Sequence, residues 1–86
     1  MDGIDEQVRR VVAAHAGLSV DVETLADEED LYRLGMSSHA NVNVMLALEE
    51  TFDIEFPEEM LRQATFRSLS AIRRSVSLLL VEVSSA

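Results

Sequence analysis

The stretch from Ser38 to Phe52 most constrains the fold, because its apolar residues cover more than one side of a helix. They recur at helical spacing and project onto an arc of about 200°. The residues on this arc are Val42, Val44, Met45, Leu46, Leu48 and Phe52. A helix that is apolar over so wide an arc needs other elements packed on several sides. The exposed strip left over is formed by His39, Asn43, Ala47 and Glu50, with Leu46 at its border.

Two other segments also show helical apolar spacing. Residues 3–16 predict a first helix, which Gly17 ends. Its apolar face carries Ile4, Val8, Val11, Val12 and His15, where we expect the histidine to be packed. A last helix, capped by Thr65, keeps its spacing over about five turns. Its apolar residues are Phe66, Leu69, Ile72, Val76, Leu79, Leu80 and Val83.

The segments between these helices are predicted as connections. "FDIEF", residues 52–56, alternates like a strand, but no second strand pattern exists to pair with it, so we expect an extended connector. Pro57 is typical of a first helical position and predicts a short third helix to about Gln63. Residues 17–37 lack periodicity and predict a long loop. Its apolar residues should hold it on the bundle in an ordered conformation; they are Leu25, Leu31, Tyr32 and Leu34.

The chain is therefore predicted to be all-α: residues 1–86 form a single four-helix domain with a long ordered loop after the first helix and a short third helix. With 86 residues there is no room for a large enclosed active-site cavity beside the core, which disfavours a self-contained enzyme. There is no cysteine, hence no disulfide or thiolate metal site. No leader or membrane-spanning run is recognisable, so we expect a cytoplasmic protein. We also expect it to be a monomer.

Acidic residues are concentrated in the middle of the chain. The net charge is −9, and between Asp21 and Glu59 twelve acidic residues face Arg33 alone. Such a field repels nucleic acid and anionic lipid, so neither is expected as a partner, and it attracts basic protein surfaces. An equally open interpretation is that these residues only keep a small protein in solution.

Two consecutive serines, Ser37 and Ser38, stand at the start of the central helix, where a hydroxyl can cap free N–H groups. A catalytic serine would need an oriented base, but adjacent helical residues such as His39 point about 100° apart. Two histidines without cysteine make no metal site. No catalytic or metal-binding residue is therefore predicted. A serine reached through a glycine at a helix start is, however, a favourable place to carry a phosphate group.

The segment "DLYRLGMSSHANVNVMLALEETFDIEFPEEML", from Asp30 to Leu61, resembles the acyl carrier protein family. The family pattern is an acidic loop, then Leu-Gly-x-Asp-Ser-Leu, a helix ending in Leu-x-Glu-Glu-x-Phe, and a short helix led by proline. In that family the motif serine bears 4′-phosphopantetheine, which a phosphopantetheinyl transferase takes from coenzyme A, and the thiol of this group carries cargo as a thioester. The resemblance implies a four-helix bundle of this type, Ser38 as the attachment residue and Ser37 as the cap.

This chain departs from the family pattern around the serine. Ser37 replaces the usual aspartate, His39 replaces leucine, and Ala40 and Asn43 stand where acidic residues are common. The variant is similar to small stand-alone bacterial carriers that receive an amino acid from a tRNA-synthetase-like amino acid:carrier protein ligase. We therefore expect an aminoacyl carrier; the alternative is an acyl carrier for fatty acid, lipid or polyketide synthesis, loaded by an acyl transferase. The expected partner face is formed by His39, Asn43, Leu46, Glu49 and Glu50.

Two other classes of function remain as contrasts. A serine hydrolase would need a base that the sequence does not offer. A purely structural adaptor, in which Ser38 is a simple cap, requires that the serine is never modified.

Overall fold

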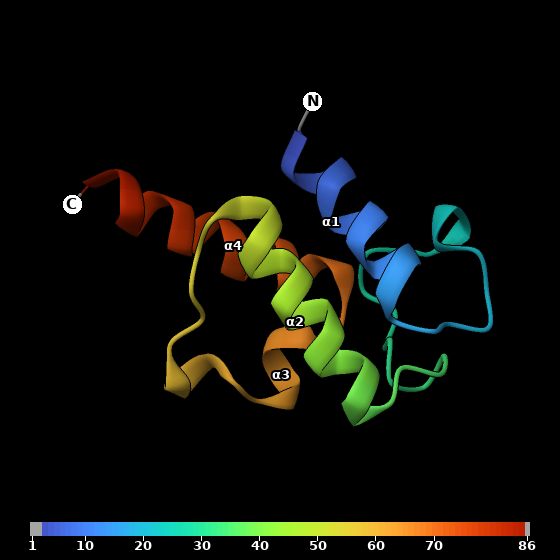
Figure 1. Ribbon diagram of the computed structural model, residues 1–86. Coiled ribbons are helices and arrows are strands. Elements are labelled where there is room, and N and C mark those ends of the chain that lie inside the picture. Colours follow the sequence, from blue (N-terminus) through green and yellow to red (C-terminus); the bar gives the residue numbers. More distant parts are fainter. Residues whose placement is uncertain (1–2, 86) are drawn as a thin grey trace.

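The computed structural model describes residues 3–85, with side chains described through residue 82, and the described part contains helices and loops but no strand (Figure 1). The helices are α1 (Gly3–His15), α2 (Ser38–Phe52), α3 (Gln63–Phe66) and α4 (Leu69–Ser85). α1 packs against both α2 and α4, and α3 packs against α4. α1 and α2 run in opposite directions (Figure 1). The predicted all-α fold with four helices and a short third helix is confirmed.

A single cluster of buried side chains joins all four helices and the long loop. The largest fully buried side chains are Val8, Val12, Leu31, Val44, Leu48, Phe66, Leu69, Ile72 and Val76. The rings of Phe56 and Phe66 add a tilted aromatic contact, with 5.2 Å between their centroids. The connector between α2 and α3 is therefore part of the core. Val83, which was predicted to face the core, lies outside the residues whose side chains are described.

Apart from Leu46, which was placed at the border of the exposed strip, two residues predicted on apolar faces lie in solvent instead. Val42 is 47% exposed, because α1 and α4 cover only part of the wide apolar arc of α2. His15, expected to be packed, is exposed at the last position of α1. The small and fully buried Ala16 closes the core at this end of the helix, and the imidazole stays in water.

The loop between α1 and α2 is held against the start of α4 by its backbone. The N–H of Leu31 donates to the carbonyl of Arg67 at 2.7 Å, and the N–H of Ser70 donates to the carbonyl of Asp27 at 3.0 Å. A short 3₁₀ helix, η1 (Val22–Thr24), lies inside the loop. These contacts explain why the loop is ordered, as its apolar residues predicted.

Gly35 is required where this loop turns toward α2. Its φ is 119°, and a Cβ here would lie 3.3 Å from the carbonyl oxygen of Gly17. Any side chain would therefore be strained and crowded. The glycine lets two distant parts of the loop pass close together immediately before the serine pair.

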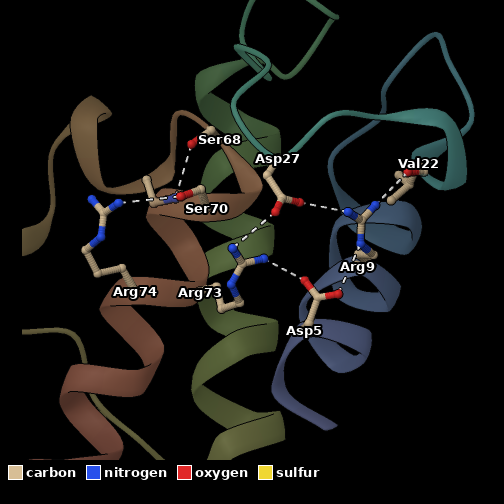
Figure 2. Close-up of polar contacts among 9 residues, drawn as sticks. Asp5, Arg9, Val22, Asp27, Ser68, Ser70, Arg73 and Arg74 are labelled. Carbon is tan, nitrogen blue, oxygen red and sulfur yellow. Dashed lines mark hydrogen bonds and ion pairs between the residues drawn. The ribbon is translucent and has the colours of Figure 1, made fainter. Parts of the chain in front are cut away.

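Charged side chains form a closed ring that joins α1, the loop and α4 (Figure 2). Arg73 donates to Asp5 at 2.7 Å and to Asp27 at 3.2 Å, and Arg9 donates to Asp27 at 2.8 Å and to Asp5 at 3.4 Å. Arg9 also donates to the carbonyl of Val22 at 3.1 Å. The hydrogen bond to Asp27, opposed by partial burial and reinforced by Asp5, raises the pKa of Arg73 above its usual value. We call Asp5, Arg9, Asp27 and Arg73 the charged ring.

The region between α2 and α4 differs in detail from the prediction. Pro57 precedes a 3₁₀ helix, η2 (Glu58–Met60), and the extended backbone of Arg62 separates this turn from α3. Thr65 lies inside α3 and does not cap the last helix. The hydroxyl of Ser68 takes that role, since it accepts a hydrogen bond of 3.1 Å from the N–H of Ala71.

Candidate functional site

The two serines at the start of α2 have different structural roles. Ser37 has an extended backbone, with φ −79° and ψ 169°, and its hydroxyl accepts a hydrogen bond of 3.0 Å from the N–H of Ala40. Its carbonyl accepts a second bond of 2.8 Å from the N–H of Asn41. Ser37 is therefore the N-cap of α2, as predicted, and its hydroxyl is engaged in the cap.

Ser38 is the first residue of α2, and its side chain is exposed. Within residues 3–85 its hydroxyl makes no hydrogen bond. The buried Met36 and the cap at Ser37 fix the backbone on its N-terminal side. Ser38 thus presents a free hydroxyl from a rigid position.

A groove of about 390 Å³ lies between α2 and the segment around α3, and Ser38 is one of the residues that line it. Its lining residues are Tyr32, Ser38, Asn41, Val42, Met45, Leu61, Arg62, Gln63 and Phe66. Val42 and Leu61 are large apolar residues of the lining that remain 47% and 48% exposed. Arg62 is the charged member of this set. The groove therefore combines an apolar surface with a few polar groups and one cation.

Tyr32 connects the long loop to this groove. Its hydroxyl lies 3.3 Å from Oδ1 of Asn41. Burial raises the pKa of the Tyr32 phenol; Arg67 opposes this effect and Asp30 adds to it. The phenol is therefore protonated at neutral pH and donates to the amide oxygen. This bond holds the loop against the helix that carries Ser38.

The residues predicted as a partner face lie along α2, but they do not form one uniform surface. His39, Asn43, Leu46 and Glu50 are exposed, and Leu46 reaches 53%. Glu49 is half-buried, and its Oε2 accepts a hydrogen bond of 2.9 Å from the N–H of Phe56. The structure thus gives Glu49 a role inside the protein.

The groove was not predicted from the sequence, and neither was its wall opposite α2, which contains Leu61 and Arg62. Val42 lies one helical turn after Ser38, so the i, i+4 relation to Ser38 was an available signal for it. Leu61 and Arg62 carry no such signal, because their proximity to α2 depends on the path of the connector.

The site has the properties needed to bear a phosphopantetheine group. Ser38 offers a free hydroxyl, and the first-turn N–H groups and dipole of α2 favour a phosphate there. The adjacent groove offers an apolar surface next to this hydroxyl. In the part of the chain that the structure describes, no three His, Asp or Glu side chains gather as a metal site requires, and no helix is long and apolar enough to cross a bilayer.

Comparisons with known proteins agree with this reading of the site. The model of the family described as "Phosphopantetheine attachment site" matches residues 6–72. An aminoacyl carrier protein from Agrobacterium fabrum is 47% identical over 73 residues, which cover 85% of this chain and 88% of that protein. An acyl carrier protein from Akkermansia muciniphila is 38% identical over 58 residues, 67% of this chain and 71% of that one.

A solved carrier-protein structure has the same fold as this chain. The carrier protein from Agrobacterium tumefaciens, in a crystal structure with an engineered Bradyrhizobium japonicum glycine:[carrier protein] ligase and ATP, superposes with a TM-score of 0.84 and is 44% identical. The match covers 87% of this chain and 97% of that chain. Together with the family match and the free serine at the start of α2, these similarities show that the chain belongs to the acyl carrier protein family, whose members bear phosphopantetheine.

Proposed function

We propose that Ser38 carries 4′-phosphopantetheine and that the protein holds an aminoacyl group on it as a thioester, loaded by an amino acid:carrier protein ligase. The observation that carries the assignment is the contrast within the serine pair. The hydroxyl of Ser37 is bound to Ala40, whereas that of Ser38 is free and exposed. The similarity to an aminoacyl carrier protein and to a carrier in complex with a glycine ligase supports the cargo.

The chain itself contributes position and recognition. The prosthetic group supplies the thiol on which cargo is held, and a phosphopantetheinyl transferase installs it on the hydroxyl of Ser38. The rigid start of α2 then fixes one end of a flexible arm, so that cargo reaches a docked enzyme at about millimolar effective concentration. The carrier catalyses no step, and we place its action in the cytoplasm, as a monomer.

A second candidate is a fatty acyl, lipid or polyketide cargo. The exposed apolar residues Val42 and Leu61 of the groove favour it, since they offer a surface that an acyl chain can cover. The similarity to an acyl carrier protein points the same way.

The attachment is tested by intact mass after incubation with coenzyme A, Mg²⁺ and a broad-specificity phosphopantetheinyl transferase. The wild-type protein should gain one phosphopantetheine. Ser38→Ala should gain none. Ser37→Ala should lose about 1 kcal/mol of stability with the cap but still be modified, more slowly. An adduct on Ser38→Ala would overturn the assignment.

The cargo is tested on the modified protein by offering two loading systems in parallel. One contains amino acids, ATP and a tRNA-synthetase-like ligase; the other contains malonyl-coenzyme A and a malonyl transferase. Mass spectrometry should identify an aminoacyl thioester. Efficient malonyl loading with no aminoacyl thioester would overturn the aminoacyl cargo and leave the carrier role in place.

A further inference from the structure

Arg62 is a cation that lines the same groove as Ser38, in a chain that is otherwise strongly acidic. We propose that the Arg62 guanidinium binds the phosphodiester of the arm attached to Ser38 and thereby positions the arm in the groove. The inference rests on the proposed attachment at Ser38.

The backbone places Arg62 firmly. Its N–H donates to the carbonyl of Met60 at 3.0 Å, and its extended conformation precedes α3. In the side chain, Nε donates to the carbonyl of Glu59 at 3.1 Å. This bond orients the guanidinium and leaves both terminal nitrogens without a protein partner among the described residues.

Of the other arginines in the described chain, Arg33 and Arg74 do not line this groove, and the rest are held by carboxylates. Arg9 and Arg73 are held in the charged ring, and Arg10 pairs with Glu6 on α1. Arg67 lies 3.9 Å from Asp30. Arg62 makes no ion pair within residues 3–85, although Glu58 and Glu59 are close in sequence. Its charge is therefore free to act on a ligand.

The charge of the groove fits the near end of the arm. A phosphodiester on Ser38 brings one negative charge to the lining of the groove, and a guanidinium binds phosphate oxygens through a planar set of donors. The lining contains no carboxylate that would compete.

The test uses the modified full-length protein, labelled with ¹⁵N, and does not depend on loading activity. ³¹P NMR relaxation reports whether the phosphorus moves with the protein, and amide shifts of residues 61–63 report contact with the groove. We compare wild type, Arg62→Gln, Arg62→Lys and the control Arg10→Gln, which removes an equal charge from an exposed site on α1. The amide spectrum also shows that each variant is folded.

In wild type and Arg10→Gln, the phosphorus should relax as part of the folded domain, and modification should shift the amides of residues 61–63. Arg62→Gln should make the phosphorus more mobile and reduce those shifts. Arg62→Lys should retain part of both effects, because it keeps the charge but lacks the Nε bond to Glu59.

Equal ³¹P relaxation in wild type and Arg62→Gln would overturn the inference. It would also be overturned if Arg62→Lys made the phosphorus as mobile, and the amide shifts as small, as Arg62→Gln does. These failures are distinct from failure of the attachment itself. In that case the transferase would add no phosphopantetheine to Ser38, and the mass measurement would show it before any NMR comparison.

Discussion

The carboxylate of Glu49 accepts a hydrogen bond of 2.9 Å from the backbone N–H of Phe56, across the turn that ends α2. Asp53 makes this turn in a left-handed conformation, with φ 55°. The bond holds the connector so that Ile54 and Phe56 enter the core, where they are 7% and 5% exposed. Glu49 therefore fixes the connector after α2, which leads to Leu61 and Arg62 on the opposite side of the groove.

Glu49→Ala should lower the free energy of unfolding by about 1 to 3 kcal/mol, because it leaves the N–H of Phe56 without its acceptor. Glu50→Ala is the matched control on the exposed side of the same helix turn, and should change stability by less than about 0.5 kcal/mol. Urea denaturation monitored by circular dichroism measures both. Equal effects of the two variants would contradict a structural role for Glu49.

The charged ring predicts a coupling between residues far apart in the chain. Asp27→Asn and Arg73→Gln should show a coupling free energy of about 1 to 2 kcal/mol in a double-mutant cycle, since these groups are half-buried and share partners. The exposed pair of Arg10 and Glu6, with side chains 72% and 74% exposed, is the control and should give less than about 0.5 kcal/mol. Similar couplings for both pairs would show that the ring adds nothing beyond surface pairing.

Two core positions test how the helices face one another. Leu48 of α2 and Ile72 of α4 are fully buried, so truncation of either to alanine should cost about 2 to 5 kcal/mol, comparable to the whole stability of a small domain. Leu46→Ala removes the same side chain as Leu48→Ala from a position that is 53% exposed and should have a small effect. The thermal midpoint decides, and an unchanged midpoint for both core variants would contradict the assigned faces.

The agreement between sequence and structure is best where burial sets the pattern. α2 begins at Ser38 and ends at Phe52 in both, because its apolar spacing reflects neighbours on several sides. The start of α4 was less predictable. Thr65 and Ser68 both offer a capping hydroxyl, and the fold selects Ser68, whose hydroxyl accepts from Ala71. Local chemistry alone does not distinguish them.

Features that depend on long-range packing were not predictable. Arg73 bonds to Asp5 across 68 positions of sequence, and no local pattern indicates that pair. The groove likewise requires Arg62 to lie near α2. By contrast, the family resemblance and capping rules assigned Ser38 and Ser37 different roles, and the hydrogen bond at Ser37 confirms the cap. Glu49 was grouped with Glu50 because its partner, Phe56, becomes a neighbour only after the chain turns.

The raised pKa of Tyr32 predicts a loss of stability at alkaline pH. Burial favours the neutral phenol in the folded state, so between the pKa of the unfolded chain, about 10, and the higher folded value, the folded state holds more protons. Stability is therefore fully present below pH of about 10 and falls as pH rises further. Tyr32→Phe should be less stable at neutral pH, without the bond to Asn41, but should lose less on raising the pH. Urea titrations at several pH values measure this, and parallel losses in both proteins would assign the alkaline effect to other groups.

The exposed face of α2 predicts how a ligase would bind. Leu46 offers apolar area and Glu50 offers charge, so contact with a basic and partly apolar enzyme surface should be both hydrophobic and ionic. Raising salt to physiological strength shortens the Debye length to about 8 Å, which should slow association without abolishing it.

Glu50→Lys should slow association further, and Leu46→Ala should mainly speed dissociation. Stopped-flow fluorescence with a carrier-specific ligase separates these rates, and Glu23→Lys, an exposed residue of η1, is the control for net charge. If Glu23→Lys and Glu50→Lys slow association equally at physiological salt, the effect belongs to the overall charge of the protein, and α2 is not the docking face.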